Sequence, residues 1–250
     1  MKIALIGYGR MGKMIESIIK DNGTHEIVFV ATSKNINELT PNHFTDCNAV
    51  IDFSIPTAVL ANAKIVLAAG KPHIIGTTGW YDKMEELKNL CSKQNGCIVY
   101  GSNFSTGVNL FFLMNDFIAK LMKTQKKYHV FIEETHHTQK KDSPSGTAIT
   151  LANSILENRS WMNEWTNSTE LTDKDADETK LAIISNRDGD AIGEHVVTYY
   201  SENDSIQIAH EAFDRKGFAE GSIVAAEWAL NKKGFFSFRE VVKEMFENAE

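Results

Sequence analysis

Up to Tyr100, short apolar runs alternate along the chain with segments of helical spacing. The strand-like runs are Lys2–Ile6, Glu26–Ala31, Ala49–Phe53, His73–Ile75 and Cys97–Tyr100. The segments between them include Lys13–Lys20, an alanine-rich stretch from Pro56 to Gly70, and Asp82–Lys93. Apolar strands that alternate with helices predict a parallel sheet with helices on both faces.

The pattern changes near Ser105, where a helix at Val108–Lys123 is followed by runs of alternating apolar and polar residues. These runs are Tyr128–Glu134, Leu181–Asn186, Glu194–Tyr200 and Ser205–Ala212, and helices are expected at Ala148–Leu156, Ala219–Leu230 and Ser237–Asn248. Alternation predicts strands with one buried face, in an antiparallel or mixed sheet. The polar segment Asn158–Lys180 is interpreted as a loop or mobile insertion.

Composition narrows the class of protein. The 250 residues allow one large or two modest domains, and 42% of them are hydrophobic. With 26 Lys and Arg against 33 Asp and Glu, the net charge of −7 disfavours a nucleic-acid partner. No apolar run reaches the roughly 18–20 residues of a membrane span. Three cysteines and a start without a signal-like segment predict reduced thiols and a cytoplasmic location.

The first strand is followed by a glycine-rich turn, Gly7-Tyr8-Gly9-Arg10-Met11-Gly12, which opens a helix. In this strand–turn–helix context the pattern indicates a dinucleotide-binding site. The first glycine permits the turn, the second lets the backbone approach a pyrophosphate, and the third brings helix and strand together. The alternative is an ordinary strand–helix turn that happens to be rich in glycine.

The end of the second predicted strand bears on the choice of cofactor. A site selective for NAD carries Asp or Glu there, but this chain has Thr32-Ser33-Lys34. Ser33 and Lys34 could hold a 2′-phosphate, although Lys34 could equally be a solvated loop lysine. The sequence therefore supports NADPH use and gives no support for exclusive use of NADH.

A loop rich in histidine and lysine, Glu133–Thr147, follows the strand that begins at Tyr128. Adjacent residues of a strand point to opposite faces, so His136 and His137 are expected to have different roles. Ser145-Gly146-Thr147 offers small donors and free N–H groups at a helix start, which suits a carboxylate or phosphate. Alternatively, the histidines are structural, or Lys140 and Lys141 are a solvated pair. No metal is expected, because no known ligand spacing joins the histidines to Glu133, Glu134 or Asp142.

Taken together, these segments resemble the dihydrodipicolinate reductase family of bacterial lysine and diaminopimelate synthesis. The resemblance covers nearly the whole chain. Its motifs are GYGRMG at Gly7–Gly12, VIDFS at Val50–Ser54, GTTG at Gly76–Gly79, NFSTGVN at Asn103–Asn109, ETHHTQKKDSPSGTA at Glu134–Ala148, GDAIGEH at Gly189–His195 and the segment His210…Arg215. The histidine–lysine–PSGT block is specific to this family, whereas the glycine motif is not.

The resemblance implies a Rossmann-like parallel-sheet cofactor domain, residues 1–106 and 215–250, around an α+β substrate and oligomerisation domain, residues 107–214, with an open mixed sheet. It implies an enzyme that uses NADH or NADPH to reduce a small dicarboxylate substrate, and a homotetramer joined through the central sheet. By this resemblance, His136 matches the acid/base histidine of the family and Lys140 matches its proton donor. His137, Gly146 and Thr147 match substrate-binding positions. Ser145 lies in the same PSGT block and is expected to bind substrate as well. Cofactor positions are Gly7–Gly12, Gly76, Thr77, Thr78, Gly101, Ser102, Asn103, Phe104 and Arg215.

Two other functions fit the glycine turn alone. A different Rossmann-type dehydrogenase of a small acid would keep the turn but gives no reason for the histidine–lysine block. A regulator that senses NAD(P) without catalysis would call for an added DNA-binding segment or a basic patch. Both alternatives stay open at the level of sequence.

Overall fold

The computed structural model of the chain describes residues 1–170 and 179–247. It divides into two compact units. Unit 1 comprises Met1–Asn109 and Lys216–Glu250, and unit 2 comprises Leu110–Arg215. The domain limits expected from the sequence, at 106/107 and 214/215, lie within three residues of these boundaries.

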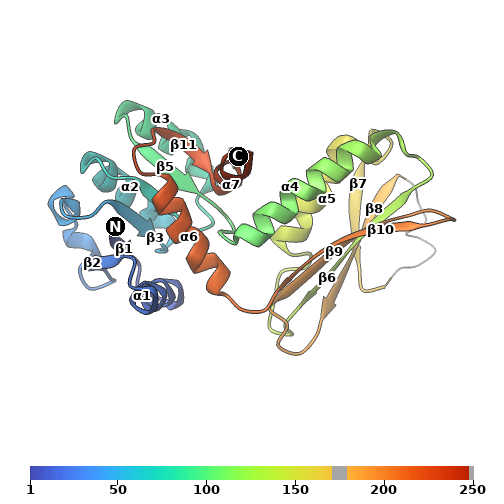
Figure 1. Cartoon of the computed structure of the whole chain (residues 1–250), viewed down its shortest axis with the longest axis horizontal. Coiled ribbons are helices and arrows are strands. Elements are labelled where there is room, and N and C mark those ends of the chain that lie inside the picture. Colours follow the sequence, from blue (N-terminus) through green and yellow to red (C-terminus); the bar gives the residue numbers. More distant parts are fainter. Residues whose placement is uncertain (171–178, 248–250) are drawn as a thin grey trace. The chain divides into compact units, whose positions relative to one another are not determined.

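Unit 1 contains a parallel sheet, as predicted, and the sheet has six strands (Figure 1). Its strands, in the order β11-β5-β4-β3-β1-β2, are β11 (Gly234–Ser237), β5 (Cys97–Tyr100), β4 (His73–Ile75), β3 (Ala49–Asp52), β1 (Lys2–Ile6) and β2 (Glu26–Ala31). The chain leaves β1 for β2 in one direction and continues from β3 in the other. The strand order therefore reverses between β1 and β3, which is where parallel α/β sheets bind ligands.

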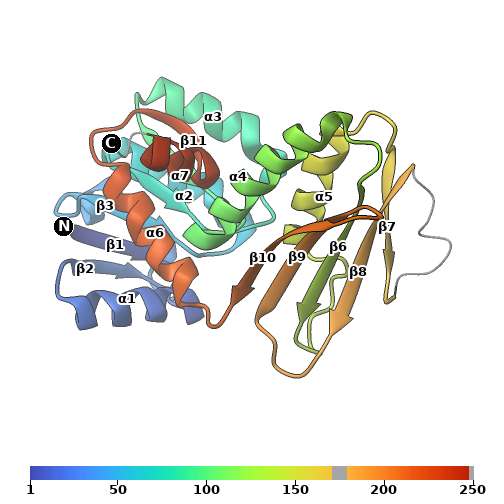
Figure 2. The same ribbon diagram turned by 45° about the vertical axis from the view of Figure 1, so that its right-hand side comes forward.

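Helices cover both faces of this sheet. On one face α1 (Arg10–Asn22) packs beside α6 (Lys216–Trp228), and α7 (Phe238–Glu247) follows β11 (Figures 1 and 2). On the other, α2 (Val59–Ala68) and α3 (Met84–Lys93) enclose an apolar core that includes Ala63, Leu87 and Ile98. Short 3₁₀ segments lie at Ile36–Glu38, Pro41–Phe44, Pro56–Ala58, Tyr81–Lys83 and Met122–Thr124.

The sixth strand of this sheet, β11, was absent from the sequence-based prediction. Its four residues pair in parallel with β5, from Gly234 beside Cys97 to Ser237 beside Tyr100. Such a short run between two helices has too few residues to display a period of two, so only its pairing identifies it as a strand.

Unit 2 contains a five-stranded mixed sheet, again as predicted. Its order is β10 (Ser205–Ala212), β9 (Gly193–Tyr200), β6 (His129–His136), β8 (Lys180–Arg187) and β7 (Glu164–Ser168). Helix α5 (Gly146–Asn158) packs on β6 and β8, and α4 (Thr106–Leu121) lies beside α5 (Figure 2). The two helices are joined where the Asn115 side chain donates to the carbonyl of Leu151 at 3.2 Å. The fold class expected from the sequence is thus confirmed in both units.

The interpretation of Asn158–Lys180 as a loop or mobile insertion was wrong for part of that segment. Strand β7 lies within it and pairs in parallel with β8 at the edge of the sheet. Its sequence, EWTNS, is mostly polar, so pairing rather than an apolar pattern makes it a strand. Residues 171–178 of the segment lie outside the described residues.

The register of the second sheet places unlike residues on one face. Along β6, Val130, Ile132, Glu134 and His136 alternate with less buried positions and are themselves buried. Val130 lies opposite Tyr199 of β9, Glu134 opposite His195 of β9, and His136 opposite Arg187 of β8. One face of this sheet is therefore apolar at the start of β6 and charged at its end.

Candidate functional site

A pocket of about 370 Å³ lies in unit 1 at the carboxyl ends of β1, β3 and β4. It is called the glycine pocket below, and it is lined by Gly9, Arg10, Met11, Phe53, Ser54, Pro56, Gly76, Thr77 and Thr78. Its lining thus brings together three of the loops that the sequence marked, at the point where the strand order reverses. Helix α1 begins beside it at Arg10, so the first-turn N–H groups of that helix have no partner within the helix.

The three glycines of the turn have distinct surroundings. A Cβ at Gly7, whose φ is +91°, would lie 2.3 Å from the carbonyl oxygen of Phe53, and a Cβ at Gly12 would lie 2.3 Å from that of Gly7. These two glycines are required by the packing of the turn itself. A Cβ at Gly9 would meet no protein atom within 4 Å, although Gly9 lines the pocket. The space beside Gly9 is therefore free for a ligand, as the close approach of a pyrophosphate requires.

A buried carboxylate supports the wall of the glycine pocket. Asp52, at the end of β3, accepts the N–H of Ser54 at 2.9 Å and the side-chain amide of Asn62 at 2.9 Å, and contacts His73 at 3.2 Å. Burial alone would raise the pKa of Asp52, but the contacts with His73, Ser54 and Asn62 hold it below its usual range. The loop after β3 is thereby tied to the neighbouring strand β4.

Other expected cofactor positions do not line the pocket. Ser33 and Lys34 are exposed after β2, where Thr32 donates its N–H to Asn35 at 2.6 Å. After β5, Gly101 donates to the Ile75 carbonyl, and Phe104 is buried against Phe53 and Phe238. The remaining ones are Tyr8, which donates to Glu16, Ser102 and Asn103 in the loop after β5, and Arg215, the last residue of unit 2.

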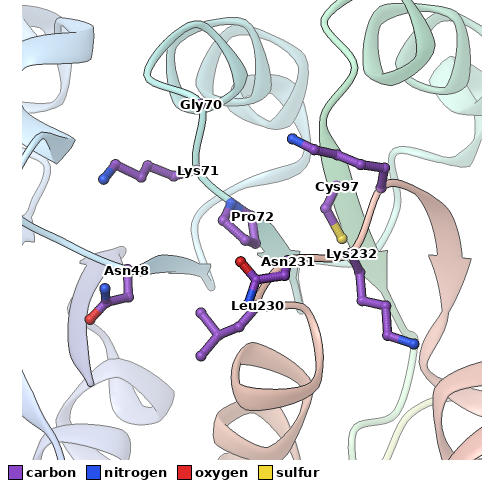
Figure 3. A pocket seen from close by; sticks show the side chains of 9 residues that line it. Asn48, Gly70, Lys71, Pro72, Cys97, Leu230, Asn231 and Lys232 are labelled. Carbon is purple, nitrogen blue, oxygen red and sulfur yellow. The ribbon is translucent and has the colours of Figure 1, made fainter.

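A second pocket of about 370 Å³ lies at the opposite edge of the unit 1 sheet, around Pro72, Cys97 and Asn231 (Figure 3). Its lysines do not converge on one point. Lys71 donates to the carbonyl of Thr45 at 3.0 Å, and Lys232 pairs with Glu244 at 2.5 Å. Figure 3 shows the Lys71 and Lys232 side chains pointing in different directions, so they form no common anion site.

The charged end of the unit 2 sheet forms a connected group, the Glu134 cluster, made of Glu134, His136, Arg187, His195 and Ser145. Glu134 is fully buried at its centre. One carboxylate oxygen, Oε1, accepts the Ser145 N–H at 3.1 Å and lies 3.3 Å from both terminal nitrogens of Arg187. The other, Oε2, lies 3.0 Å from Nδ1 of His136 and 3.7 Å from Nε2 of His195.

The members of the Glu134 cluster differ in their charge at neutral pH. Burial alone would raise the pKa of Glu134, but the contacts from His136, Ser145 and Ser185 hold it well below its usual range. Burial lowers the pKa of His195 to about 3, with a further contribution from the charge of His136. At neutral pH the cluster therefore contains an ionised Glu134 and an uncharged His195.

The loop after β6 carries the remaining candidates of unit 2. Lys140 pairs with Asp142, with its Nζ 2.8 and 2.7 Å from the two carboxylate oxygens, and the Asp142 carbonyl accepts from Arg187 at 2.6 Å. His137 is half-buried and accepts the N–H of Lys140 through its carbonyl. The Glu134 cluster is thus joined through Arg187 to the turn that bears Lys140.

The start of α5 is capped by Ser145. Its hydroxyl accepts the N–H of Ala148 at 3.1 Å and lies 2.9 Å from Nε2 of His195. Because Ser145 is buried, its side chain forms part of the frame of the site. Gly146 and Thr147 follow it, exposed and half-buried, in the first turn of a helix whose N-terminus favours an anion.

Three donors of the cluster could in principle hold a metal ion. Glu134, His136 and His195 each place one ligand atom within 4.8 Å of the others. The single carboxylate of this set already faces the Arg187 guanidinium, so a divalent ion would add two positive charges that no second carboxylate of the set balances. The charge balance of the cluster therefore disfavours a divalent ion between these three residues.

Sequence reasoning did not assign roles to Glu134, Arg187 or His195. Glu134 offered a signal, because a carboxylate in register with Val130 and Ile132 on an alternating strand must be buried and therefore paired. Arg187 and His195 lie close to it only through the pairing of β6 with β8 and β9, which a single sequence does not specify.

Both the family models and the relatives that match this chain cover nearly its whole length. Family models described as the N-terminus and the C-terminus of dihydrodipicolinate reductase match residues 1–104 and 107–242. A 4-hydroxy-tetrahydrodipicolinate reductase of Christiangramia forsetii is 44% identical over 248 residues, which cover 99% of this chain and all of that protein. One of Methanococcoides burtonii is 34% identical over 89% of this chain and 91% of its own length.

A solved structure extends the likeness to the fold. Dihydrodipicolinate reductase from Paenisporosarcina sp. TG-14, with dipicolinate bound, has a TM-score of 0.76 at 20% identity. It covers 96% of this chain and 98% of its own.

Proposed function

The chain belongs to the dihydrodipicolinate reductase family, and on this basis we propose that it reduces 4-hydroxy-tetrahydrodipicolinate to tetrahydrodipicolinate with NADH or NADPH. In this reaction the substrate loses water and gains a hydride and a proton. The hydride comes from NAD(P)H, which becomes NAD(P)⁺. The observation that carries the proposal is the 44% identity over nearly the full length to a reductase of this name.

The glycine pocket supports the cofactor part of the proposal. The open space beside Gly9 and the start of α1 suit a pyrophosphate, and Gly76, Thr77 and Thr78 line the same pocket. The nicotinamide, when bound, supplies the hydride. Unit 1 contributes the backbone surface that binds and orients it.

The loop after β6 supports the substrate part. A dicarboxylate would be repelled by a chain of net charge −7, unless a local positive field reverses the effect. Lys140, Lys141, His137 and the N-terminus of α5 at Gly146 and Thr147 supply such a field within one loop. The dipicolinate in the Paenisporosarcina enzyme is likewise a small dicarboxylate.

His136 and Lys140 are the proposed groups that move protons. Reduction of an unsaturated ring leaves charge that has to be protonated, and a positioned acid accelerates such a step by about 10²–10⁴-fold. His136 lies 3.0 Å from Glu134, whereas Lys140 pairs with an exposed carboxylate, Asp142. We assign His136 to acid/base work and Lys140 to proton donation near the substrate carboxylates.

A steady-state assay tests the proposal directly. The purified chain is mixed with freshly prepared 4-hydroxy-tetrahydrodipicolinate, and the oxidation of NADH and NADPH is followed by absorbance. Turnover that depends on this substrate, with tetrahydrodipicolinate as product, supports the assignment. Turnover with other small acids but not with this one would contradict it.

We also propose that the protein is a cytoplasmic homotetramer joined through the unit 2 sheet. The face of that sheet without helices carries apolar side chains such as Phe131, Ile184 and Val196, and β10 is an edge strand with Ile206 exposed. Cys47, Cys91 and Cys97 are free and buried, as expected in a reducing compartment. Light scattering of the purified protein gives the oligomeric state.

For the described residues, no helix has the length and apolar character that a membrane span needs.

A further inference from the structure

We propose that Glu134 is a positioning residue that holds His136 in the tautomer protonated on Nδ1, so that Nε2 is the nitrogen that exchanges a proton with the substrate. This inference rests on the proposed function, in which His136 does acid/base work. It adds a residue, Glu134, and an atom, Nε2, to that assignment.

The surroundings of the carboxylate decide which atom faces His136. Oε1 already receives the N–H of Ser145 and lies within 3.3 Å of both terminal nitrogens of Arg187, so it is the oxygen on which donors converge. Oε2 lies 3.0 Å from Nδ1 of His136, and in the part of the chain that the structure describes neither of these two buried atoms has a hydrogen-bond partner. A buried carboxylate oxygen requires a donor, and a proton on Nδ1 supplies one.

The remaining neighbours restrict the ring further. The rings of His136 and His195 meet edge to face, with centroids 5.1 Å apart. A Cβ at position 193 would lie 2.9 Å from Nε2 of His136, so glycine there keeps a side chain from covering this nitrogen. A carboxylate thus lies beside Nδ1 of the ring, an uncharged histidine flanks it, and position 193 adds no side chain beside Nε2.

The substitution Glu134→Gln has a specific consequence. The Gln carbonyl has to take the position of Oε1, because the Ser145 N–H and Arg187 both donate there. The Gln amide group then faces Nδ1 of His136 and donates to it, which moves the ring proton to Nε2. The variant keeps the shape of the side chain but reverses the tautomer, as in the amide variant of a serine-protease triad.

The experiment measures the tautomer and the kinetics together. Nitrogen-15 NMR of histidine-labelled protein, with the His136 signals assigned from His136→Gln, is recorded at a pH where the ring is neutral. We expect the Nδ1–H form in the wild type and the Nε2–H form in Glu134→Gln. We expect kcat of Glu134→Gln to fall at least ~10²-fold, as for loss of a general acid–base group, with KM changed by less than about threefold.

Glu157→Gln is the matched control, because Glu157 is an exposed glutamate of α5 and lies outside the Glu134 cluster. It is expected to keep the wild-type tautomer and kcat. An Nε2–H ring in the wild type would overturn the inference even if Glu134→Gln does not fold. An unchanged tautomer with lowered kcat in Glu134→Gln would also overturn it. The NMR reading needs no turnover, so failure of the proposed function is recognised separately, by a wild type without activity.

Discussion

The glycine pocket of unit 1 and the Glu134 cluster of unit 2 are built in opposite ways. The glycine pocket depends on side chains that are missing, since a Cβ at Gly7 or Gly12 would collide with backbone and one at Gly9 would enter the pocket. The Glu134 cluster depends on polar side chains gathered around one buried carboxylate, to which Arg187 and His195 come from the neighbouring strands β8 and β9. A backbone site suits a ligand shared by many enzymes, whereas a side-chain cluster suits one particular reaction.

This contrast predicts how each site fails. A change in the glycine pocket should affect cofactor affinity or local folding. A change in the Glu134 cluster or its loop should affect turnover while the fold persists.

The largest effect is expected from Lys140→Ala and His136→Gln. Each removes a group proposed to move a proton, so kcat should fall at least ~10²-fold while the melting temperature stays close to that of the wild type. Thr147→Val is the matched comparison, because it removes a hydroxyl proposed to bind a carboxylate and should raise KM more than it lowers kcat. Steady-state kinetics on the three variants, together with thermal unfolding, provides the measurement. Folded Lys140 and His136 variants that keep more than about a third of kcat, with chemistry rate-limiting, would refute these roles.

The second prediction compares two glycines of one turn. Gly9→Ala places a methyl group where no protein atom lies within 4 Å, so stability should change little while the Kd for NADPH rises at least about tenfold. Gly7→Ala should instead lower the free energy of unfolding by about 2 kcal/mol or more, because of its positive φ and the contact with Phe53. Fluorescence titration with NADPH and urea unfolding separate the two outcomes. Equal loss of stability in both variants would mean that Gly9 has a packing role as well.

The third prediction concerns how the free energy of unfolding depends on pH through two buried residues, His195 in unit 2 and Asp52 in unit 1. The pKa of His195 is lowered from 6.5 to about 3, so below pH 6.5 the unfolded chain binds a proton that the folded chain does not. The free energy of unfolding should therefore fall as the pH drops from 6.5, by up to about 1.4 kcal/mol per pH unit from this residue. Asp52 of unit 1 has a lowered pKa, so its contribution is present above its ordinary value of 3.8 and is lost only at lower pH.

Urea unfolding of the wild type and of His195→Gln between about pH 7 and about pH 5 measures how the free energy of unfolding changes with pH. A histidine whose pKa is lowered by folding destabilises the fold only on acidification. The slope should be shallower in His195→Gln than in the wild type. His129→Gln, at an exposed position of β6, is the control and should keep the wild-type slope. Identical slopes in all three proteins would contradict the burial of an uncharged His195.

The smallest effect concerns cofactor choice. Without a carboxylate at Thr32–Lys34, kcat/KM with NADPH should be within about tenfold of that with NADH, or higher, a difference of only ~1.4 kcal/mol. Parallel assays with the two cofactors measure the ratio. A preference for NADH beyond about a hundredfold would require another residue that reads the 2′ position.

Much of the fold could be predicted from local sequence. Strands β2, β4 and β5 begin and end at the residues expected, because each is a compact apolar run bounded by polar residues, glycine or proline. The glycine turn was recognised because its requirements are local, and its three glycines lie within six residues of one another. Strands β7 and β11 were not found, since their identity depends on a partner strand rather than on their own pattern.

The sequence by itself determined the two kinds of sheet, the glycine turn and the segment that carries His136 and Lys140. Only the tertiary structure decided that Glu134 is the centre of a buried group, since its partner Arg187 lies 53 positions further along the chain. Backbone conformation and hydrophobic period are properties of neighbouring residues, and a sequence states them directly. The partner of a buried charge is set by strand register, which follows from the packing of the whole sheet.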